Sequence, residues 1–294
     1  MSQKYRVHPL LLGEAEVGCA LDVFWGMTKD QGRVTVPVFA FLIEGGPDPI
    51  LIDAGMRSAD RAMKIHRLGP HRMPKSMSLP AQLAKHGVKP EEIGAVILTH
   101  LHYDHCGGCE QLPNARIVVQ RSELAAAAAP MGPRTLEIGS RELFYDRHDV
   151  SAMVDTLWDR VELIEGDTEL FPGIECILYP NSHTPGSQCV YIKTLDGIIG
   201  CVGDMVRKVD LNVKKAIPPG IYYDLEQMQR AMRDIAIRSD IVYPAHDPLV
   251  LEEDFEKRRL AVISCPHNST NRAPWLQRKT APQNGAVIAK WSGK

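Results

Sequence analysis

The sequence predicts an α/β fold, because strand-like and helix-like segments both recur along it. The strand-like segments are short apolar runs rich in β-branched residues, such as 34–43 and 95–98, each followed by a turn. The clearest helical segment spans 226–238, where apolar residues recur at helical spacing. Side chains that can bind metal ions stand where several strand-like runs end, so we expect the chemistry of the protein at strand termini.

The composition is that of an ordinary globular chain, with 44% apolar and 24% charged residues among 294. The net charge of -2 does not indicate nucleic-acid or membrane binding, and no apolar run approaches the ~20 residues that span a bilayer. The apolar run 10–12 is too short for a signal peptide, and the seven cysteines lack regular spacing. We therefore expect a cytoplasmic protein with free thiols, and neither nucleic acid nor membrane as a partner.

The N-terminal part contains a predicted β-hairpin, formed by strands 34–43 and 50–53 around the turn residues 45–49. Pro37 inside the first strand indicates an edge position or a late start of the strand pairing. Asp53 ends the second strand. Its carboxylate either orients a metal-binding histidine or satisfies backbone groups at the strand end, and the sequence leaves both readings open.

A basic segment, 56–80, follows the hairpin and is interrupted by three prolines. We expect a long irregular loop of the kind that often forms a lid or a binding segment. His66 and His71 lie in it without ligand-like spacing, so we predict ordinary loop histidines. A short helix is predicted over 79–87, ended by Gly87.

The densest group of polar side chains comes directly after strand 95–98, where His100, His102, Asp104 and His105 fall within six positions. In extended chain, residues two apart point to the same side, so His100 and His102 can converge on one metal ion. Asp104 and His105 can turn toward a second ion, since the two glycines that follow let the chain turn sharply. Imidazole and carboxylate are ligands that zinc and similar divalent metals prefer.

The second half of the chain is predicted to be mostly β-structure. Ser122 is expected to cap a helix over 122–129, Phe144 and Trp158 to pack in a core, and His148 to be structural or exposed. The remaining predicted elements are a β-meander of strands at 161–164, 174–178, 188–192 and 198–202, the helix 226–238, and a strand at 241–243.

Three later side chains have ligand chemistry and stand at strand ends. His183 lies in a turn after the strand 174–178, Asp204 ends the strand near 200–204, and His246 follows strand 241–243. Each position alone is a weak indication. Together, at three similar turns, they favour a shared site with the 100–105 stretch.

This set resembles the pattern of the metallo-β-lactamase superfamily, and the resemblance covers nearly the whole chain. That pattern is an H-x-H-x-D-H stretch, a histidine in a Gly/Pro turn, an aspartate after a strand and a late histidine. It implies a four-layer αβ/βα sandwich with the site at the edge of two facing sheets. We accordingly expect one hydrolase domain over 1–265, with 266–294 as a loosely packed C-terminal extension of it.

The resemblance also assigns the ligands of two divalent metal ions, with zinc favoured and manganese, iron or cobalt compatible with the same side chains. The first metal would be held by three histidines, the second by an aspartate and two histidines, and one aspartate would bridge them: His100, His102 and His183; Asp104, His105 and His246; Asp204.

Within the superfamily, the chain is most similar to the lactonase branch, which contains N-acyl-homoserine lactonases and 4-pyridoxolactonase. The shared segments are 36–38, 51–55, 105–108, 121–123, 183–186 and 245–247. The branch implies a small-molecule lactone or ester as substrate, a quorum-quenching type of reaction, and a homodimer as an oligomeric state that relatives often adopt.

One position departs from that branch. Homoserine lactonases carry a tyrosine three residues after the bridging aspartate, and this chain has Arg207 there. Tyr222 or Tyr223 could take the place of that tyrosine in space. Arg207, with Lys208 and the basic segment 56–80, suggests a substrate with a carboxylate, whereas a solvated basic face explains the same residues equally well.

The expected reaction is attack of a metal-activated water on a lactone carbonyl, with Asp204 or Asp104 passing a proton to the leaving alkoxide. One alternative is a hydrolase of another ester, thioester or cyclic amide on the same metal site. Another is a diiron redox protein, against which His102 counts, because flavo-diiron proteins have glutamate there. Cys106 and Cys109 are predicted to be buried packing residues rather than a redox or zinc pair.

Overall fold

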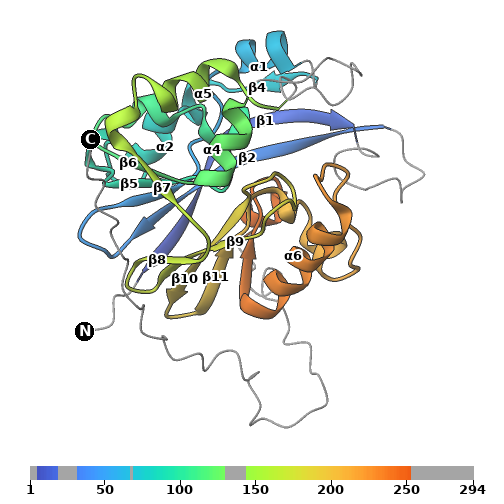
Figure 1. Ribbon diagram of the computed structural model, residues 1–294. Coiled ribbons are helices and arrows are strands. Elements are labelled where there is room, and N and C mark those ends of the chain that lie inside the picture. The colour runs from blue at the N-terminus through green and yellow to red at the C-terminus, as the bar shows by residue number, and fades with distance from the viewer. Residues whose placement is uncertain (1–4, 19–31, 67–68, 130–143, 253–294) are drawn as a thin grey trace, which may run out of the picture. The chain divides into compact units, whose positions relative to one another are not determined.

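The computed structural model describes residues 5–18, 32–66, 69–129 and 144–252. Within these ranges, twelve strands form a sheet of seven and a sheet of five (Figure 1). The larger sheet has the order β4 (His71–Arg72), β1 (Arg6–Gly18), β2 (Arg33–Glu44), β3 (Ile50–Ile52), β5 (Ala95–Ile97), β6 (Arg116–Gln120) and β7 (Val161–Ile164). The smaller sheet has the order β12 (Ile241–Tyr243), β11 (Gly197–Cys201), β10 (Gln188–Thr194), β9 (Ile174–Leu178) and β8 (Thr168–Phe171).

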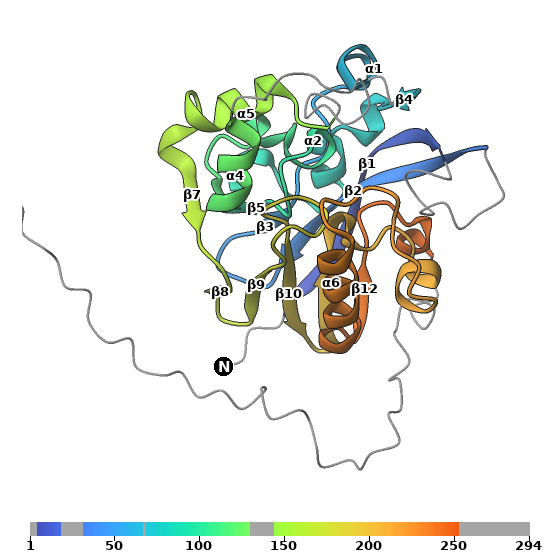
Figure 2. The same cartoon turned by 45° about the vertical axis from the view of Figure 1, so that its right-hand side comes forward.

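Helices cover the outer face of each sheet, as Figures 1 and 2 show. The larger sheet carries α2 (Leu79–Ala84), α4 (Arg121–Ala128) and α5 (Arg147–Val154), and the smaller sheet carries α6 (Leu225–Arg238). Two further helices, α1 (Ala59–His66) and α3 (Tyr103–Cys106), lie in the connections that follow β3 and β5. None of the described helices combines the length and the apolar character needed to cross a membrane.

Three separate apolar clusters fill the spaces between these layers. Phe41, Ile97 and Ile192 belong to the cluster between the two sheets. Leu42 and Leu83 belong to the cluster beneath the helices of the larger sheet, and a third cluster lies between α6 and the smaller sheet. The order helix, sheet, sheet, helix is the predicted four-layer αβ/βα sandwich, which the structure confirms.

The predicted strand 34–43 lies within β2, and both faces of β2 are buried. This burial explains why polar and apolar residues do not alternate along it. Its odd-numbered residues Phe39, Phe41 and Ile43 pack between the sheets, while Ala40 and Leu42 pack under the helices. A strand buried on both faces is expected to be a continuous apolar run.

Strand β1 was not predicted from the sequence, although it pairs with β2 over the whole length from Arg6 opposite Glu44 to Gly18 opposite Arg33. Pro9 and Gly13 within it are weak strand formers, which hides the pattern. Of the two alternatives given for Pro37, the edge position does not describe β2 as a whole, because β2 lies between β1 and β3.

The late start of pairing that Pro37 also indicated is confirmed on the other side of β2. Strand β3 pairs only with Phe41, Leu42 and Ile43. Among the described residues, no strand therefore pairs with Pro37 on the side of β2 that faces away from β1. The carbonyl oxygen of Pro37 accepts a hydrogen bond from His246 Nδ1 at 2.7 Å.

Several local predictions were wrong. The segment 56–80 contains α1, β4 and the start of α2 rather than one irregular loop. Helix α4 begins at Arg121, with Gln120 at the N-cap position, so Ser122 lies inside the helix. Strand β7 joins the larger sheet, parallel to β6, instead of the meander.

The prediction for Trp158 was also wrong, because its side chain is 66% exposed. The helix predicted over 226–238 and the strand predicted over 241–243 are confirmed by α6 and β12. Residues 1–261 group into one compact unit. The expected extension 266–294 lies outside the described residues, and the boundary at 265 stays a prediction.

Candidate metal centre

The candidate ligands follow the carboxyl ends of strands from both sheets. Strands β3, β5 and β6 run parallel, as do β11 and β12, so their last residues meet at one edge. The 100–105 stretch follows β5, His183 follows β9, Asp204 follows β11 and His246 follows β12. The fold thereby brings together all seven residues that the sequence singled out.

Four of these side chains form one group: His100, His102, His183 and Asp204. Nδ1 of His102 lies 3.1 Å from Nε2 of His183, and the ring of His100 lies 4.4 Å from that of His102. All four are buried, and each offers one ligand atom within 4.8 Å of the others.

The second group contains Asp104, His105 and His246. Nε2 of His246 lies 3.5 Å from Oδ2 of Asp104, and Nε2 of His105 lies 3.8 Å from Oδ1 of the same carboxylate. Asp104 and His105 stand on α3, so the chain turns away from the extended path of His100 and His102 at this helix.

Asp204 faces both groups. Its Oδ1 lies 3.3 Å from Nε2 of His105 and 3.0 Å from Nε2 of His246. Its Oδ2 lies 3.5 Å from Nε2 of His183 in the first group. This is the arrangement that a carboxylate bridging two metal ions requires.

The residues present fit a pair of divalent ions. Four buried atoms that face the centre make no hydrogen bond of normal geometry with the described part of the chain: Nε2 of His100, His105 and His246, and Oδ1 of Asp204. A buried polar atom without a partner carries a free-energy cost, so such atoms call for an ion or another group between them. Imidazole nitrogens with carboxylate oxygens suit zinc and related metals.

Three of the ligand histidines are oriented by a partner on Nδ1. Nδ1 of His105 contacts Asp53 at 2.8 Å, Nδ1 of His183 contacts the Ile221 carbonyl at 3.0 Å, and His246 contacts Pro37 as described. A hydrogen bond at Nδ1 fixes the tautomer that leaves Nε2 free to bind a metal.

Asp53 therefore has the orienting function that the sequence left open, together with the backbone function. The carboxylate is fully buried and also accepts hydrogen bonds from the backbone N–H and the hydroxyl of Thr99, both at 2.8 Å. Asp53 reaches this position with a left-handed φ of 58°, a conformation that Asp tolerates better than most residues.

Burial and the surrounding charges shift the pKa values of the ligands. Burial lowers the pKa of His100 and of His102 well below its usual range, and it lowers that of His183 to about 4. Burial also acts against the charged form of His105, but Asp53, Asp104 and Asp204 outweigh it and raise that pKa. The first three rings are therefore neutral at pH 7, which is the state that binds metal.

The two glycines after the stretch have a different function from the one predicted. Gly107 and Gly108 have φ values of -63° and -90°, which any residue adopts. A Cβ atom at Gly107 would lie 2.3 Å from the backbone nitrogen of Arg57, and one at Gly108 would lie 2.2 Å from the carbonyl oxygen of Ala54. Glycine is needed here for close packing of two backbone segments rather than for a sharp turn.

Sequence reasoning missed Glu123, which lies in the first turn of α4 and is fully buried. Its Oε1 accepts hydrogen bonds from the N–H of Leu101 at 2.9 Å and the hydroxyl of Tyr145 at 3.1 Å. Its Oε2 accepts from the hydroxyl of Thr184 at 2.7 Å and the N–H of Gly186 at 2.9 Å.

These contacts join the two loops of the first ligand group. Leu101 lies between His100 and His102, and Thr184 directly follows His183. Burial raises the pKa of Glu123, although its hydrogen bonds oppose that effect. The sequence carries two weak signals: an acidic residue in a first helical turn, which is favourable there in any case, and the place of Glu123 in the segment 121–123 shared with the lactonase branch. Neither indicates the long-range contacts.

Aromatic side chains hold the 102–106 turn. His102 stacks on Phe144 with ring centroids 5.0 Å apart, so Phe144 supports a ligand rather than packing in a central core. Tyr103 contacts two buried histidines, stacking on His66 at 4.0 Å and bonding through its hydroxyl to Nε2 of His71 at 2.6 Å. The two histidines predicted as ordinary loop residues thus brace the metal-binding turn.

Arg207 lies inside the centre rather than on a basic surface. Its side chain is about 5% exposed, and its guanidinium donates to Oδ2 of Asp204. Part of the basic segment 56–80 is also engaged within the protein, because Arg57 pairs with Asp149 and Arg61 with Asp146. A freely solvated basic face therefore does not account for these three arginines.

Tyr222 and Tyr223, suggested as spatial substitutes for the tyrosine that the lactonase branch has at position 207, lie in two different environments. The backbone N–H of Tyr223 donates to the Ser182 carbonyl at 2.7 Å, so this segment supports the His183 loop. The side chain of Tyr223 is 64% exposed, and Tyr222 packs against the cluster beneath α6. Contact of either side chain with a substrate stays a prediction.

Cys106 and Cys109, which form a C-x-x-C segment, are buried packing residues, as predicted. Cys106 and Cys109 are free and buried in the cluster beneath the helices, and burial raises both pKa values. His148 is half exposed and lies 3.3 Å from Glu110.

Comparison with known proteins agrees with this fold and centre. The model of the metallo-beta-lactamase superfamily matches residues 33–246, and the chain belongs to that superfamily. An N-acyl homoserine lactonase of Bacillus cereus is 29% identical over 170 residues, which cover 55% of this chain and 60% of that protein. An N-acyl homoserine lactonase of Agrobacterium fabrum, AiiB, is 29% identical over 167 residues, 54% of this chain and 59% of that protein. The matches thus span about 60% of the length of these relatives.

Solved structures are similar over more of the chain. A quorum-quenching N-acyl homoserine lactone hydrolase is 25% identical, with a TM-score of 0.68, over 86% of this chain and 96% of that one. AidC, a dizinc quorum-quenching lactonase in complex with its product, has a TM-score of 0.64 at 15% identity, over 84% and 90% of the two chains, and shows likeness of fold alone.

Replacing Asp53 by asparagine should weaken metal binding about 10–100-fold, because the hydrogen bond that orients His105 loses its charged acceptor. Competition with a chromophoric chelator measures the affinity of each variant. Asp48→Asn, at an exposed position on the same hairpin, is the matched control. Equal metal affinity in Asp53→Asn and the parent protein would contradict the orienting function.

Proposed function

We propose that this protein is a metal-dependent hydrolase that opens the ring of a lactone. The observation that carries the proposal is the pair of buried ligand groups joined by Asp204. Membership of the superfamily and the similarity to proteins named N-acyl homoserine lactonases support this reaction class. A cytoplasmic location and a homodimer stay predictions.

Two divalent ions would be held by the seven ligands, with His100, His102 and His183 at one position and Asp104, His105 and His246 at the other. Asp204 would contact both. We favour zinc, because every ligand is an imidazole or a carboxylate, and the same donors accept manganese, iron and cobalt. When bound, such ions supply Lewis acidity that activates water and polarises a carbonyl.

The protein's own residues then have distinct functions. Asp204 is held by contacts on both of its oxygen atoms and is 4% exposed. Asp104 is more accessible, with 13% of its side chain exposed, and makes only the longer contacts of the second group. We therefore assign the proton transfer to the leaving alkoxide to Asp104 and the bridging position to Asp204.

Ring opening of a lactone releases an acid, so proton release measures the reaction. Metal-loaded protein would be tested with acyl-homoserine lactones of several chain lengths, an aromatic lactone that bears a carboxylate, and a simple aryl ester. We expect rapid turnover of one lactone class, lost on removal of the metals by a chelator. Turnover of esters or thioesters without any lactone would assign the chain to another hydrolase group. Oxygen or nitric oxide turnover by an iron-loaded, non-hydrolytic protein would contradict the proposal altogether.

The position of Arg207 favours a substrate with a carboxylate. Its guanidinium lies beside Asp204 in the centre, where the relatives of the lactonase branch are expected to have a tyrosine. Arginine is suited to binding carboxylates through two parallel hydrogen bonds.

Replacing Arg207 by alanine should raise KM for a carboxylate-bearing lactone about tenfold or more and leave KM for a neutral acyl-homoserine lactone nearly unchanged, since a charge-assisted contact is worth about 1.5–3 kcal/mol. Steady-state kinetics on both substrates make the comparison. Arg116→Ala removes an arginine that pairs with Glu162 on β7 and is the control. Equal losses on both substrates would instead mean that Arg207 acts only by positioning Asp204.

A further inference from the structure

A second cluster of metal-binding side chains lies away from the centre, in the part of the larger sheet formed by β1 and β2. It contains His8 on β1, Glu44 at the end of β2, and His86 just after α2. Nε2 of His8 lies 2.9 Å from Oε2 of Glu44, and the rings of His8 and His86 have centroids 4.7 Å apart. One ligand atom from each of the three residues lies within 4.8 Å of the others.

The backbone holds all three residues in place. His8 pairs with Leu42 across the strands, so His8 and Glu44 project from the same face of the sheet. His86 lies in the turn that ends α2, where its N–H donates to the Leu83 carbonyl at 2.9 Å. Because Leu42 and Leu83 are both buried in the cluster beneath the helices, this face and this turn are packed against each other.

The chemistry of the group suits a divalent ion better than it suits a simple ion pair. Nε2 of His8 is buried and lacks a hydrogen bond of normal geometry with the described residues, although Glu44 is close. Two imidazoles and one carboxylate, with water in the fourth position, form a known tetrahedral zinc arrangement.

The distances leave room for such an ion after small movements. Zinc binds nitrogen and oxygen at about 2.0–2.2 Å, so its tetrahedral ligands lie about 3.4 Å from each other. Observed separations range from 2.9 Å to within 4.8 Å. The side chains are partly exposed, at 29% for His8 and 27% for Glu44, which gives an ion and its water access.

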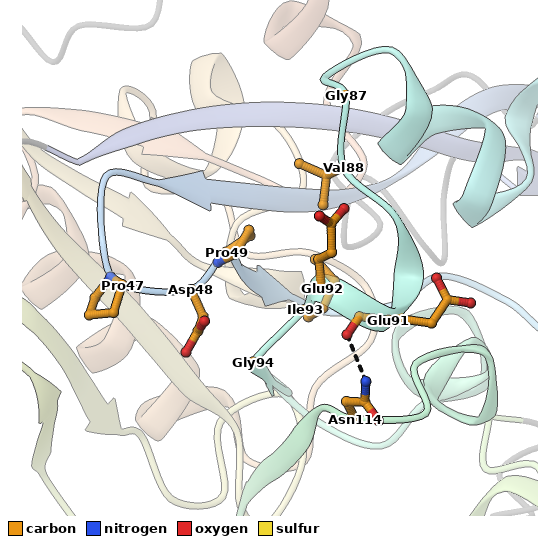
Figure 3. Close-up of a pocket in the computed structure, with 10 residues that line it drawn as sticks. All are labelled: Pro47, Asp48, Pro49, Gly87, Val88, Glu91, Glu92, Ile93, Gly94 and Asn114. Atoms are coloured by element: carbon orange, nitrogen blue, oxygen red, sulfur yellow. Dashed lines mark hydrogen bonds between the residues drawn. The ribbon is translucent and has the colours of Figure 1, made fainter.

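A pocket of about 610 Å³ adjoins the same two chain segments (Figure 3). Gly87 and Val88, which follow His86, line it together with Pro47, Asp48 and Pro49 from the turn after Glu44. Its other lining residues include Glu91 and Glu92, so three carboxylates surround it. The turn that carries His86 and the turn after Glu44 therefore border the same cavity.

We propose that His8, Glu44 and His86 form a third metal site, which binds one zinc ion with water as the remaining ligand. The site is separate from the metal centre, because Glu44 lies at the end of the hairpin where β3 begins, whereas Asp53 and the centre lie where β3 ends. An ion there would tie the N-terminal strand to the end of α2. This proposal goes beyond the hydrolase function and does not depend on it.

The test is a zinc titration of protein whose metal centre is already loaded. Isothermal titration calorimetry, with metal content after desalting as a second readout, should give a third equivalent of zinc in the parent protein. We expect His86→Gln and Glu44→Gln to lose that equivalent while keeping the two metals of the centre. His148→Gln removes an exposed histidine that also faces a glutamate, Glu110, and should keep all three.

The number of zinc ions bound per chain decides whether the third site exists. Two equivalents in the parent protein, or three in His86→Gln, would overturn the third site. The melting temperature of the parent protein should also rise by a few degrees in excess zinc, since an ion that binds only the folded state stabilises it. That rise should be absent from His86→Gln, whose melting temperature without excess zinc should equal that of the parent. Lactone hydrolysis does not enter any of these outcomes, so the site and the proposed reaction can fail separately.

Discussion

Replacing Asp104 by alanine should lower kcat/KM for the preferred lactone by about 10³-fold or more. The change removes one ligand of the second metal and the carboxylate to which we assign proton transfer, and a positioned general acid or base alone contributes about 10²–10⁴-fold. The position is more exposed than Asp204 and carries fewer contacts, so the fold should survive. Proton-release kinetics with a measurement of bound metal test the expectation.

Asp104→Asn separates the two effects. Asparagine keeps an oxygen that can bind a metal but cannot accept a proton, so this variant should retain more metal than Asp104→Ala and still lose most of its turnover. Asp159→Ala removes an exposed aspartate elsewhere and should behave like the parent protein. If Asp104→Ala carries two metals and keeps its kcat/KM, the assignment of proton transfer is wrong.

Replacing Glu123 by alanine should destabilise the protein by about 3–5 kcal/mol, among the largest effects of a single substitution. The carboxylate is fully buried and accepts four hydrogen bonds, and each buried donor left without a partner costs about 1–3 kcal/mol. For a chain of 294 residues, that loss corresponds to a fall of about 5–8 °C in melting temperature.

The same substitution should also lower activity and metal affinity, because Glu123 fixes the loops that carry His100, His102 and His183. Thermal and urea unfolding measure the stability, and chelator competition measures the metals. Glu226→Ala, which removes an exposed glutamate paired with Arg230 on α6, should change stability by less than about 0.5 kcal/mol. A loss of stability in Glu123→Ala no larger than in this control would contradict the function given to Glu123.

The loss of stability on removing Glu123 should depend on bound metal less than the loss on removing a metal ligand does. Asp204 and the histidines compensate one another and can bind ions, whereas Glu123 makes hydrogen bonds to neutral donors alone. Its contribution should therefore persist in protein stripped of metal.

The sequence determined the fold class and the positions of the candidate ligands. The ligands stand in the turns that come after short apolar runs, and both the runs and the turns are local features that periodicity and turn chemistry encode. The helix 226–238 and the strand 241–243 were predicted for the same reason and are confirmed. The superfamily was identified from the ligand pattern and is confirmed by the match over 33–246.

Only the tertiary structure decided how these local pieces combine. Glu123 and Gly186 are 63 residues apart, and His8 and His86 meet only because β1 pairs with β2 beneath the end of α2. The sequence also did not show that the guanidinium of Arg207 donates to Asp204, and contact of Arg207 with a substrate stays a prediction. Periodicity reports which face of an element is buried, but it carries no information on which distant element covers that face. Contacts between distant segments therefore fix the oriented histidines, the buried carboxylate and the second ligand cluster.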